Sequence, residues 1–83
     1  MTYRITIRKR AIKILEGINE PYYSKIKKSI YNLTKNPRPD GCKKLKGRNG
    51  YRIRVADYRI IYEIFDDKLI IDVIALGHRK DIY

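Results

Sequence analysis

The sequence predicts an α+β domain, in the order β-α-α-β-β-β-β, with two N-terminal helices packed on one face of a mainly antiparallel sheet of four to five strands. The first observation behind this prediction is periodicity. Apolar residues alternate with polar ones at the N-terminus, recur at helical spacing up to residue 33, and alternate again from residue 51. The second is that tight-turn signals separate the later strands, which favours antiparallel pairing. The 83 residues are expected to form a single domain spanning 1–83.

The N-terminal segment reads as a strand followed by a helix. Alternation of apolar and polar side chains predicts a strand over residues 2–7. From Lys9 the apolar residues fall at helical spacing instead, and Gly17 is placed to end this first helix. The long helical connection lets the first strand reach a distant position in the same sheet.

A second helix begins near Pro21, because proline in a first helical turn loses no hydrogen bond. Asn19 or Glu20 is expected to cap it. The helix must end by residue 36, since the residue before Pro37 is pushed out of the helical conformation. Its expected buried stripe consists of Tyr22, Ile26, Ile30 and Leu33, and its expected solvated face carries Lys25, Lys27 and Lys28.

The rest of the chain reads as strands joined by short turns. A loop over residues 37–41, with Asp-Gly turn chemistry, separates these strands from the second helix. The expected strands cover residues 44–46, 51–55, 58–65 and 69–76, and the expected turns lie at Asn49-Gly50, Ala56-Asp57 and Asp66-Asp67. The tyrosines at positions 51, 58 and 62 alternate as sheet residues do, which favours a packing role for them.

The charge of the chain indicates a polyanionic partner. Twenty Lys and Arg against nine Asp and Glu give a net charge of +11, and residues 37–55 alone carry seven basic side chains and one acidic one. An excess of this size on a short chain favours nucleic acid as the partner. A solvated basic loop is the plainer explanation of the central run.

Neither a cofactor nor a membrane location is expected. The chain has no apolar run near the roughly 20 residues that a spanning helix needs. Its N-terminus lacks the apolar core of a signal peptide, so the cytoplasm is the expected location. One His and one Cys cannot build a zinc site of the usual kind. Cys42 has no cysteine partner for an internal disulfide, and we assign it no role.

A cluster of arginines is expected on one face of the sheet. In residues 51–55 the apolar positions alternate with Arg52 and Arg54, so the two arginines project together from the face opposite the helices. Arg59, across the next turn, joins them if the hairpin register allows it. The sequence shows no obvious acidic partners for this face, and a bound phosphate backbone explains it better than stability does. A solvated outer face is the alternative.

Four segments of the chain together resemble the RelE branch of the RelE/ParE toxin superfamily. They are residues 43–47 (KKLKG), 51–55 (YRIRV), 58–64 (YRIIYEI) and 77–83 (GHRKDIY). The resemblance spans nearly the whole chain. It implies a toxin of a bacterial or archaeal toxin-antitoxin pair that cleaves mRNA in the ribosomal A site without a metal. It also implies an acidic, RelB-like antitoxin that wraps around the toxin, and the same helix-on-sheet architecture.

The resemblance also implies roles for individual residues. Arg59 and Arg79 match arginines that hold the scissile phosphate, and Tyr83 matches a tyrosine that stacks on a base or assists proton transfer. Arg52 and Arg54 fall where the family often has lysine. The basic residues expected to contact RNA or the ribosome are Lys43, Lys44, Lys46, Arg48 and Lys80.

One departure from the family pattern concerns the general base. If the family base is a lysine at the position of Arg52, the arginine is a poor substitute because it stays protonated. His78 is then the better candidate for acid or base, since imidazole is the side chain that titrates near neutral pH. A polar residue at a strand end, with no chemical role, is the alternative for His78.

Two other functions are compatible with the sequence. One is a ParE-like toxin that poisons DNA gyrase and is not a nuclease, and the other is a nucleic-acid-binding module without catalysis. Arg59, Arg79 and Tyr83 favour the nuclease, because a gyrase-binding toxin has no use for a phosphate-binding constellation with an aromatic terminus.

Overall fold

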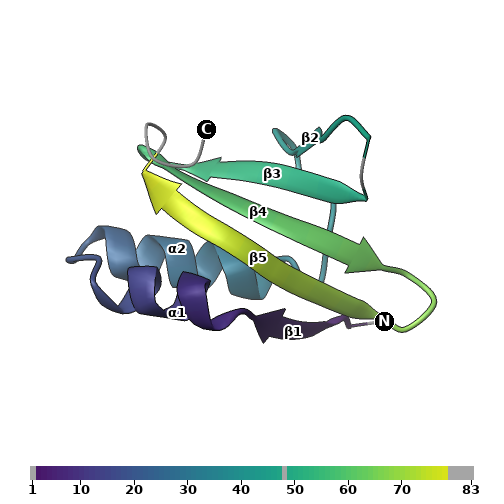
Figure 1. Ribbon diagram of the computed structural model, residues 1–83, viewed down its shortest axis with the longest axis horizontal. Helices are drawn as coiled ribbons and strands as arrows, with labels where there is room; N and C mark the ends of the chain where they lie inside the picture. The colour runs from purple at the N-terminus through teal and green to yellow at the C-terminus, as the bar shows by residue number, and fades with distance from the viewer. Residues whose placement is uncertain (1, 48, 79–83) are drawn as a thin grey trace.

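The chain forms two layers, a five-stranded sheet and a pair of helices that packs on one of its faces (Figure 1). The computed structural model describes residues 2–47 and 49–78. In chain order the elements are β1 (Arg4–Ile7), α1 (Lys9–Glu16), α2 (Tyr22–Asn32), β2 (Lys43–Lys44), β3 (Gly50–Val55), β4 (Tyr58–Phe65) and β5 (Ile70–His78). The strands lie in the order β1-β5-β4-β3-β2.

This arrangement confirms the predicted α+β class and element order. The three strand pairs formed by β2 to β5 are antiparallel, whereas β1 runs parallel to β5, with Ile5 opposite Ile71. The parallel pair is the one whose strands are far apart in sequence, as the long helical connection requires. In the described part of the chain, no helix is long and apolar enough to cross a membrane.

The core lies between the helices and the facing side of the sheet. Its central side chains come from both layers and are almost completely shielded from solvent: Ala11, Ile26, Ile30, Leu33, Ile60, Tyr62, Ile71 and Val73. Three of the four residues in the expected stripe of α2 belong to this core. The fourth, Tyr22, is 41% exposed because it lies at the helix start, where its ring rests 5.9 Å from that of Tyr58.

The N-cap residue of α2 is Pro21, not Asn19 or Glu20 as expected, although the Glu20 side chain still binds the start of the helix. The Glu20 carboxylate accepts hydrogen bonds from the Ser24 hydroxyl at 2.7 Å and from the Ser24 backbone N–H at 3.0 Å. These bonds lower the pKa of Glu20 below its usual value. The carboxylate thereby satisfies one of the N–H groups that a helix start leaves without an intrahelical partner.

The edge strand β2 is shorter and earlier than expected. It covers Lys43–Lys44, not residues 44–46, and it pairs with β3. The Leu45 N–H donates to the Gly50 carbonyl at 2.9 Å, and Gly47 adopts a positive φ of 73°. The pairing therefore ends with this bond and the chain turns through Gly47, because glycine can take this conformation without strain.

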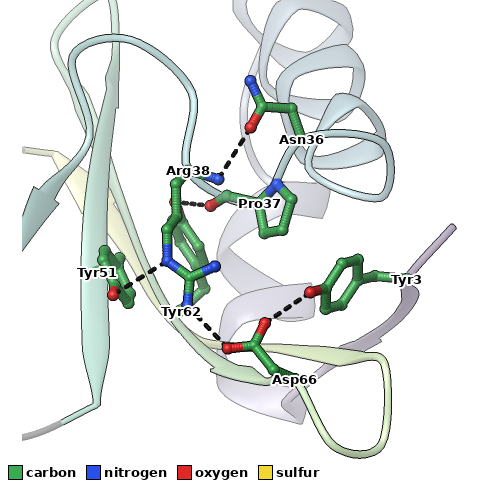
Figure 2. Close-up of polar contacts among 7 residues, drawn as sticks. All are labelled: Tyr3, Asn36, Pro37, Arg38, Tyr51, Tyr62 and Asp66. Atoms are coloured by element: carbon green, nitrogen blue, oxygen red, sulfur yellow. Dashed lines mark hydrogen bonds and ion pairs between the residues drawn. The ribbon is translucent and has the colours of Figure 1, made fainter. Parts of the chain in front are cut away.

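A polar network ties the loop after α2 to the far edge of the sheet (Figure 2). The Arg38 guanidinium donates to Asp66 at 2.9 Å and to the Tyr51 hydroxyl at 3.2 Å, and the Tyr3 hydroxyl donates to Asp66 at 2.6 Å. The network joins the residue before β1, strand β3, the loop and the turn after β4. Its donors, Arg38 first and then Tyr3, hold the pKa of Asp66 below its usual value.

This lowered pKa predicts an acid-side stability loss that depends on Asp66. A carboxyl whose pKa is lower in the folded state stabilises the fold above its unfolded pKa, about 3.9, and this contribution disappears as the pH falls. Asp66→Asn should therefore lower the urea midpoint at pH 7 and reduce its further fall towards pH 3. Asp67→Asn, at an exposed neighbouring site, is the matched control. An acid loss of equal size in wild type and Asp66→Asn would contradict the prediction.

Candidate functional site

The hairpin of β3 and β4 places two arginines side by side on the outer face of the sheet, the face away from the helices. The two-residue turn at Ala56-Asp57 sets a register in which Arg54 lies directly opposite Arg59. Ile53 and Ile60, the adjacent pair in the ladder, are buried towards the helices. Side chains alternate between faces along a strand, so both arginines point outward with Cβ atoms about 5 Å apart.

Neighbouring strands extend this pair into a cationic surface. Arg52 lies one row further along β3, and its partner in β2 is Lys43, so both share the outer face. On its other side Arg59 lies opposite Gly77 of β5, which has no side chain. We call Lys43, Arg52, Arg54 and Arg59 the arginine row. Within it Arg54 is exposed, whereas Arg52 and Arg59 are half-buried.

The outer face is polarised, which corrects the expectation that it lacks acidic groups. Glu63 pairs with Asp72 across β4 and β5, and both belong to the outer face because Glu63 is four residues from Arg59 on one strand. Asp72 is engaged by Arg8 of the adjoining segment at 3.2 Å. The carboxylates thus lie towards the end of the sheet where β4 finishes, and the arginine row lies towards the β3–β4 turn.

His78 does not join the arginine row, although it was expected to line the same site. Its partner in β4 is Tyr58, so it shares the helix-facing side of the sheet with that tyrosine. The two rings meet edge to face with centroids 5.7 Å apart. Its sequence neighbour Gly77 occupies the outer face instead, opposite Arg59. The structure therefore separates His78 from the arginines by the thickness of the sheet.

The remaining basic residues fall in three places. Lys44 lies opposite Tyr51, on the helix-facing side of the sheet, where it lines a small cavity together with Arg38 and Asp66. Lys46 lies exposed in the turn between β2 and β3. The other residues expected in the site, Arg48, Arg79, Lys80 and Tyr83, lie outside the described residues.

Two members of this surface were not placed on it from the sequence. Glu63 has the same parity as Arg59 along β4, so counting positions along the predicted strand could have placed it on the arginine face. Lys43 was grouped with Lys44 and Lys46 as a general RNA contact. Only the pairing of a two-residue strand separates Lys43 from Lys44, and no periodic signal exists over so short a segment.

The arginine row suits one kind of chemistry. A guanidinium stays charged at all cellular pH values and presents a planar fork that binds two oxygens of a phosphate. Two such groups in register can hold a phosphodiester and stabilise charge that builds on it. They cannot accept a proton, so a base must come from elsewhere. Residues 2–47 and 49–78 contain no cluster of metal-ligating side chains.

Comparison with known proteins assigns the chain to a family. The family model described as the ParE toxin of the type II toxin-antitoxin system matches residues 5–83. The chain belongs to the RelE/ParE superfamily of toxins. Several relatives carry RelE names. The mRNA interferase toxin RelE of Escherichia coli (strain K12) is 28% identical, and the match covers 96% of this chain and 86% of the relative. The putative toxin RelE1 of Methanocaldococcus jannaschii is 31% identical, with 100% and 97% covered.

Solved structures of RelE proteins have the same fold. The RelE chain in the RelE–RelB complex from Pyrococcus horikoshii superposes with a TM-score of 0.86 at 30% identity, and the match covers 98% of this chain and 99% of that one. The intact RelBE toxin-antitoxin complex of E. coli gives a TM-score of 0.80 at 26% identity, with 92% and 95% covered. These likenesses confirm the RelE-type recognition and the fold predicted from the sequence.

Proposed function

We propose that this chain is the toxin of a type II toxin-antitoxin pair and a ribosome-dependent endoribonuclease that cuts mRNA in the A site. In the reaction the 2′-hydroxyl oxygen attacks the adjacent phosphorus and loses its proton to a base. The bond to the 5′-oxygen breaks, and that oxygen takes up a proton. The products are a 2′,3′-cyclic phosphate and a 5′-hydroxyl end, and no metal takes part in the proposed step.

The observation that carries this proposal is the facing pair Arg54 and Arg59 in a chain whose relatives include an mRNA interferase. The pair would hold the scissile phosphate and stabilise the negative charge of the crowded phosphorus. Arg52 and Lys43 would bind the neighbouring phosphates of the same strand. We assign His78 no part in the proposed step, because its position on the other face of the sheet does not favour one.

Two further roles rest on the resemblance alone. Arg79 would complete the phosphate grip and Tyr83 would stack on a base or assist proton transfer, and both lie outside the described residues. The proposed partner is an acidic, RelB-like antitoxin in a toxin-antitoxin hetero-oligomer. This is supported by the RelB chains in the similar complexes and by the net charge of +11. The proposed site of action is the cytoplasm, where ribosomes translate mRNA.

A second candidate function is the poisoning of DNA gyrase, because the matching family model carries the name ParE. Translation of a reporter mRNA on purified ribosomes, run beside a gyrase supercoiling assay, separates the two. The nuclease predicts a discrete cut in the message at the A-site codon and normal supercoiling. An intact message with inhibited supercoiling would replace the nuclease with the gyrase poison, and no effect in either assay would leave a binding module.

The arginine pair predicts a conflict between activity and stability. Like charges directly opposite each other on a sheet are destabilising, by an amount within the roughly 0.2–1 kcal/mol range of cross-strand pairs. Arg54→Gln should therefore raise the free energy of unfolding by a few tenths of a kcal/mol at low salt, while it lowers cleavage. Urea unfolding at low and high salt checks this, because screening should erase the gain. A destabilised Arg54→Gln protein would contradict the repulsion.

A further inference from the structure

The helix α2 lies in a long stretch of chain without any carboxylate. Residues 21–39 contain five Lys and Arg and no Asp or Glu. Among residues 2–47 and 49–78, none of the lysines in this stretch is ion-paired. Surface helices gain stability from Glu–Lys pairs three or four positions apart, and α2 has none of them.

The charge pattern of α2 opposes the helix itself. Its first turn has no acidic residue and contains Lys25, so the Glu20 carboxylate just before the helix is left to meet the preference of the positive end of the helix dipole for acidic groups. Lys25 and Lys28 stand three positions apart, where like charges repel. A solvated face selected only for solubility has no need of this cost. A polyanion bound to the helix would remove it.

The outward side of α2 presents basic and aromatic side chains at helical spacing. With Ile26, Ile30 and Leu33 turned into the core, the opposite side presents Lys28, Tyr31 and Lys35, the last in the turn after the helix. Spacings of three and four residues align the three side chains in one row about 10 Å long. We call them the α2 stripe.

An exposed aromatic ring stands at the centre of this stripe. Tyr31 is 62% exposed, and the Lys35 Nζ lies 5.7 Å from its ring centroid. Lys27 makes a similar contact with Tyr23 at the flank, at 5.5 Å. Basic side chains interleaved with exposed aromatic rings are typical of surfaces that bind phosphate backbones and stack on bases or sugars. The stripe has no aliphatic side chain that would anchor an acidic peptide in an apolar contact.

We propose that the α2 stripe is a second RNA-binding surface that grips the phosphate backbone of a folded RNA. It lies on the helix layer, whereas the arginine row lies on the far side of the sheet (Figure 1). A folded RNA can therefore be held at the stripe while a single strand occupies the arginine row. The identification of this RNA as ribosomal RNA rests on the proposed function; the binding of folded RNA does not.

The test measures the affinity of the full chain for a short blunt RNA duplex as a function of salt. Lys28→Gln/Lys35→Gln should weaken binding about tenfold near 0.1 M salt. The plot of log affinity against log salt should also become shallower by about 1 to 2, because each phosphate contact contributes about 0.9 to its steepness in duplex DNA. The control Lys9→Gln/Lys68→Gln removes the same charge at exposed sites outside the stripe.

Tyr31→Ala should weaken binding severalfold without changing the slope. Thermal melting of each variant confirms that it is folded.

Each outcome of this experiment either supports or overturns the proposal that the α2 stripe binds folded RNA. Equal losses in the stripe and control variants would show a response to net charge only and overturn the proposal. So would a stripe variant that loses affinity for a polyglutamate peptide more than for the duplex, since the surface would then serve an acidic protein. The duplex assay contains neither ribosomes nor cleavage, so a failed nuclease leaves its result intact. In a cleavage assay the stripe variant should raise the half-saturating ribosome concentration, whereas an arginine-row variant should lower the rate at saturation.

Discussion

Arg59→Ala is expected to lower the single-turnover rate of mRNA cleavage on saturating ribosomes by about 10² to 10³-fold. This is the range found when one preorganised donor to a developing oxyanion is removed. Arg59 lies at the centre of the site, between Arg54 on β3 and Gly77 on β5. The loss should appear in the rate and not in ribosome affinity, because the arginine acts mainly as charge builds on the phosphate.

Two further variants test whether the loss of rate comes from the Arg59 guanidinium itself. Arg59→Lys keeps the charge but loses the planar fork, so it should recover only part of the rate. Arg4→Ala removes an exposed arginine from β1, two strands away from β4 in the sheet, and should cleave at the wild-type rate. A fall of less than threefold in Arg59→Ala would remove Arg59 from the chemistry and leave the arginine row as a docking surface.

Tyr62→Ala is expected to have the largest effect on stability. The Tyr62 side chain is fully buried between the sheet and the helices, and its hydroxyl donates to the Pro37 carbonyl at 2.7 Å (Figure 2). Removal of a buried aromatic ring costs about 3–5 kcal/mol, which is a large part of the roughly 5–15 kcal/mol that stabilises a typical domain. A substantial unfolded population at 37 °C is the expected result.

Tyr62→Phe separates the hydroxyl from the ring. It keeps the packing but leaves the part-buried Pro37 carbonyl without its donor, at an expected cost of about 1–3 kcal/mol. Tyr22→Phe deletes a hydroxyl from a 41% exposed ring and should stay within about 0.5 kcal/mol of wild type. Urea unfolding of the three variants checks the order. A Tyr62→Phe protein as stable as Tyr22→Phe would show that the bond to the loop contributes nothing.

The Tyr62 bond also bears on the site, although it is remote from it. The loop that it holds leads directly into β2, which brings Lys43 beside Arg52. Loosening this loop should therefore weaken the contribution of Lys43 before it affects Arg54 and Arg59, whose places depend on the β3–β4 hairpin alone.

The sequence predicted that Arg52 and Arg54 share one face of the sheet, but it left open the register that brings Arg59 to them. Residues 51–65 form one hairpin with a two-residue turn; alternation predicts the face of each side chain, and the structure supplies the register. Arg54 and Arg59 are five residues apart in the chain, so no long-range contact is needed to bring them together.

The place of His78 could not be predicted in the same way. Simple alternation from Val73 would put residue 78 on the outer face, but the ladder between β4 and β5 shifts at Ile61/Tyr62, where Tyr62 pairs with Val73 and Ile61 with Ala75. One extra residue in β5 reverses the face of every side chain after it. A bulge of this kind depends on strand packing and has no signal in the apolar pattern of a strand that is buried on both faces.

The contacts of the Arg38 network could not be predicted from the sequence for a different reason. Arg38 and Asp66 are 28 positions apart, and Tyr3 and Asp66 are 63 apart. Each contact joins residues whose types are unremarkable on an exposed loop or turn. Only the assembly of the whole sheet, with β1 at its edge beside β5, brings them to one place.

The central claim is that the arginine row supports attack by an mRNA 2′-hydroxyl. The most direct measurement replaces one ribose by deoxyribose, at the nucleotide whose 2′-hydroxyl lies beside the cut, in an mRNA on programmed ribosomes. Our account predicts cleavage at the A-site codon of the all-ribose message, with a 2′,3′-cyclic phosphate end, and no cut at that bond in the substituted message. Cleavage of the substituted message at the same bond would contradict it, because the nucleophile would then come from elsewhere.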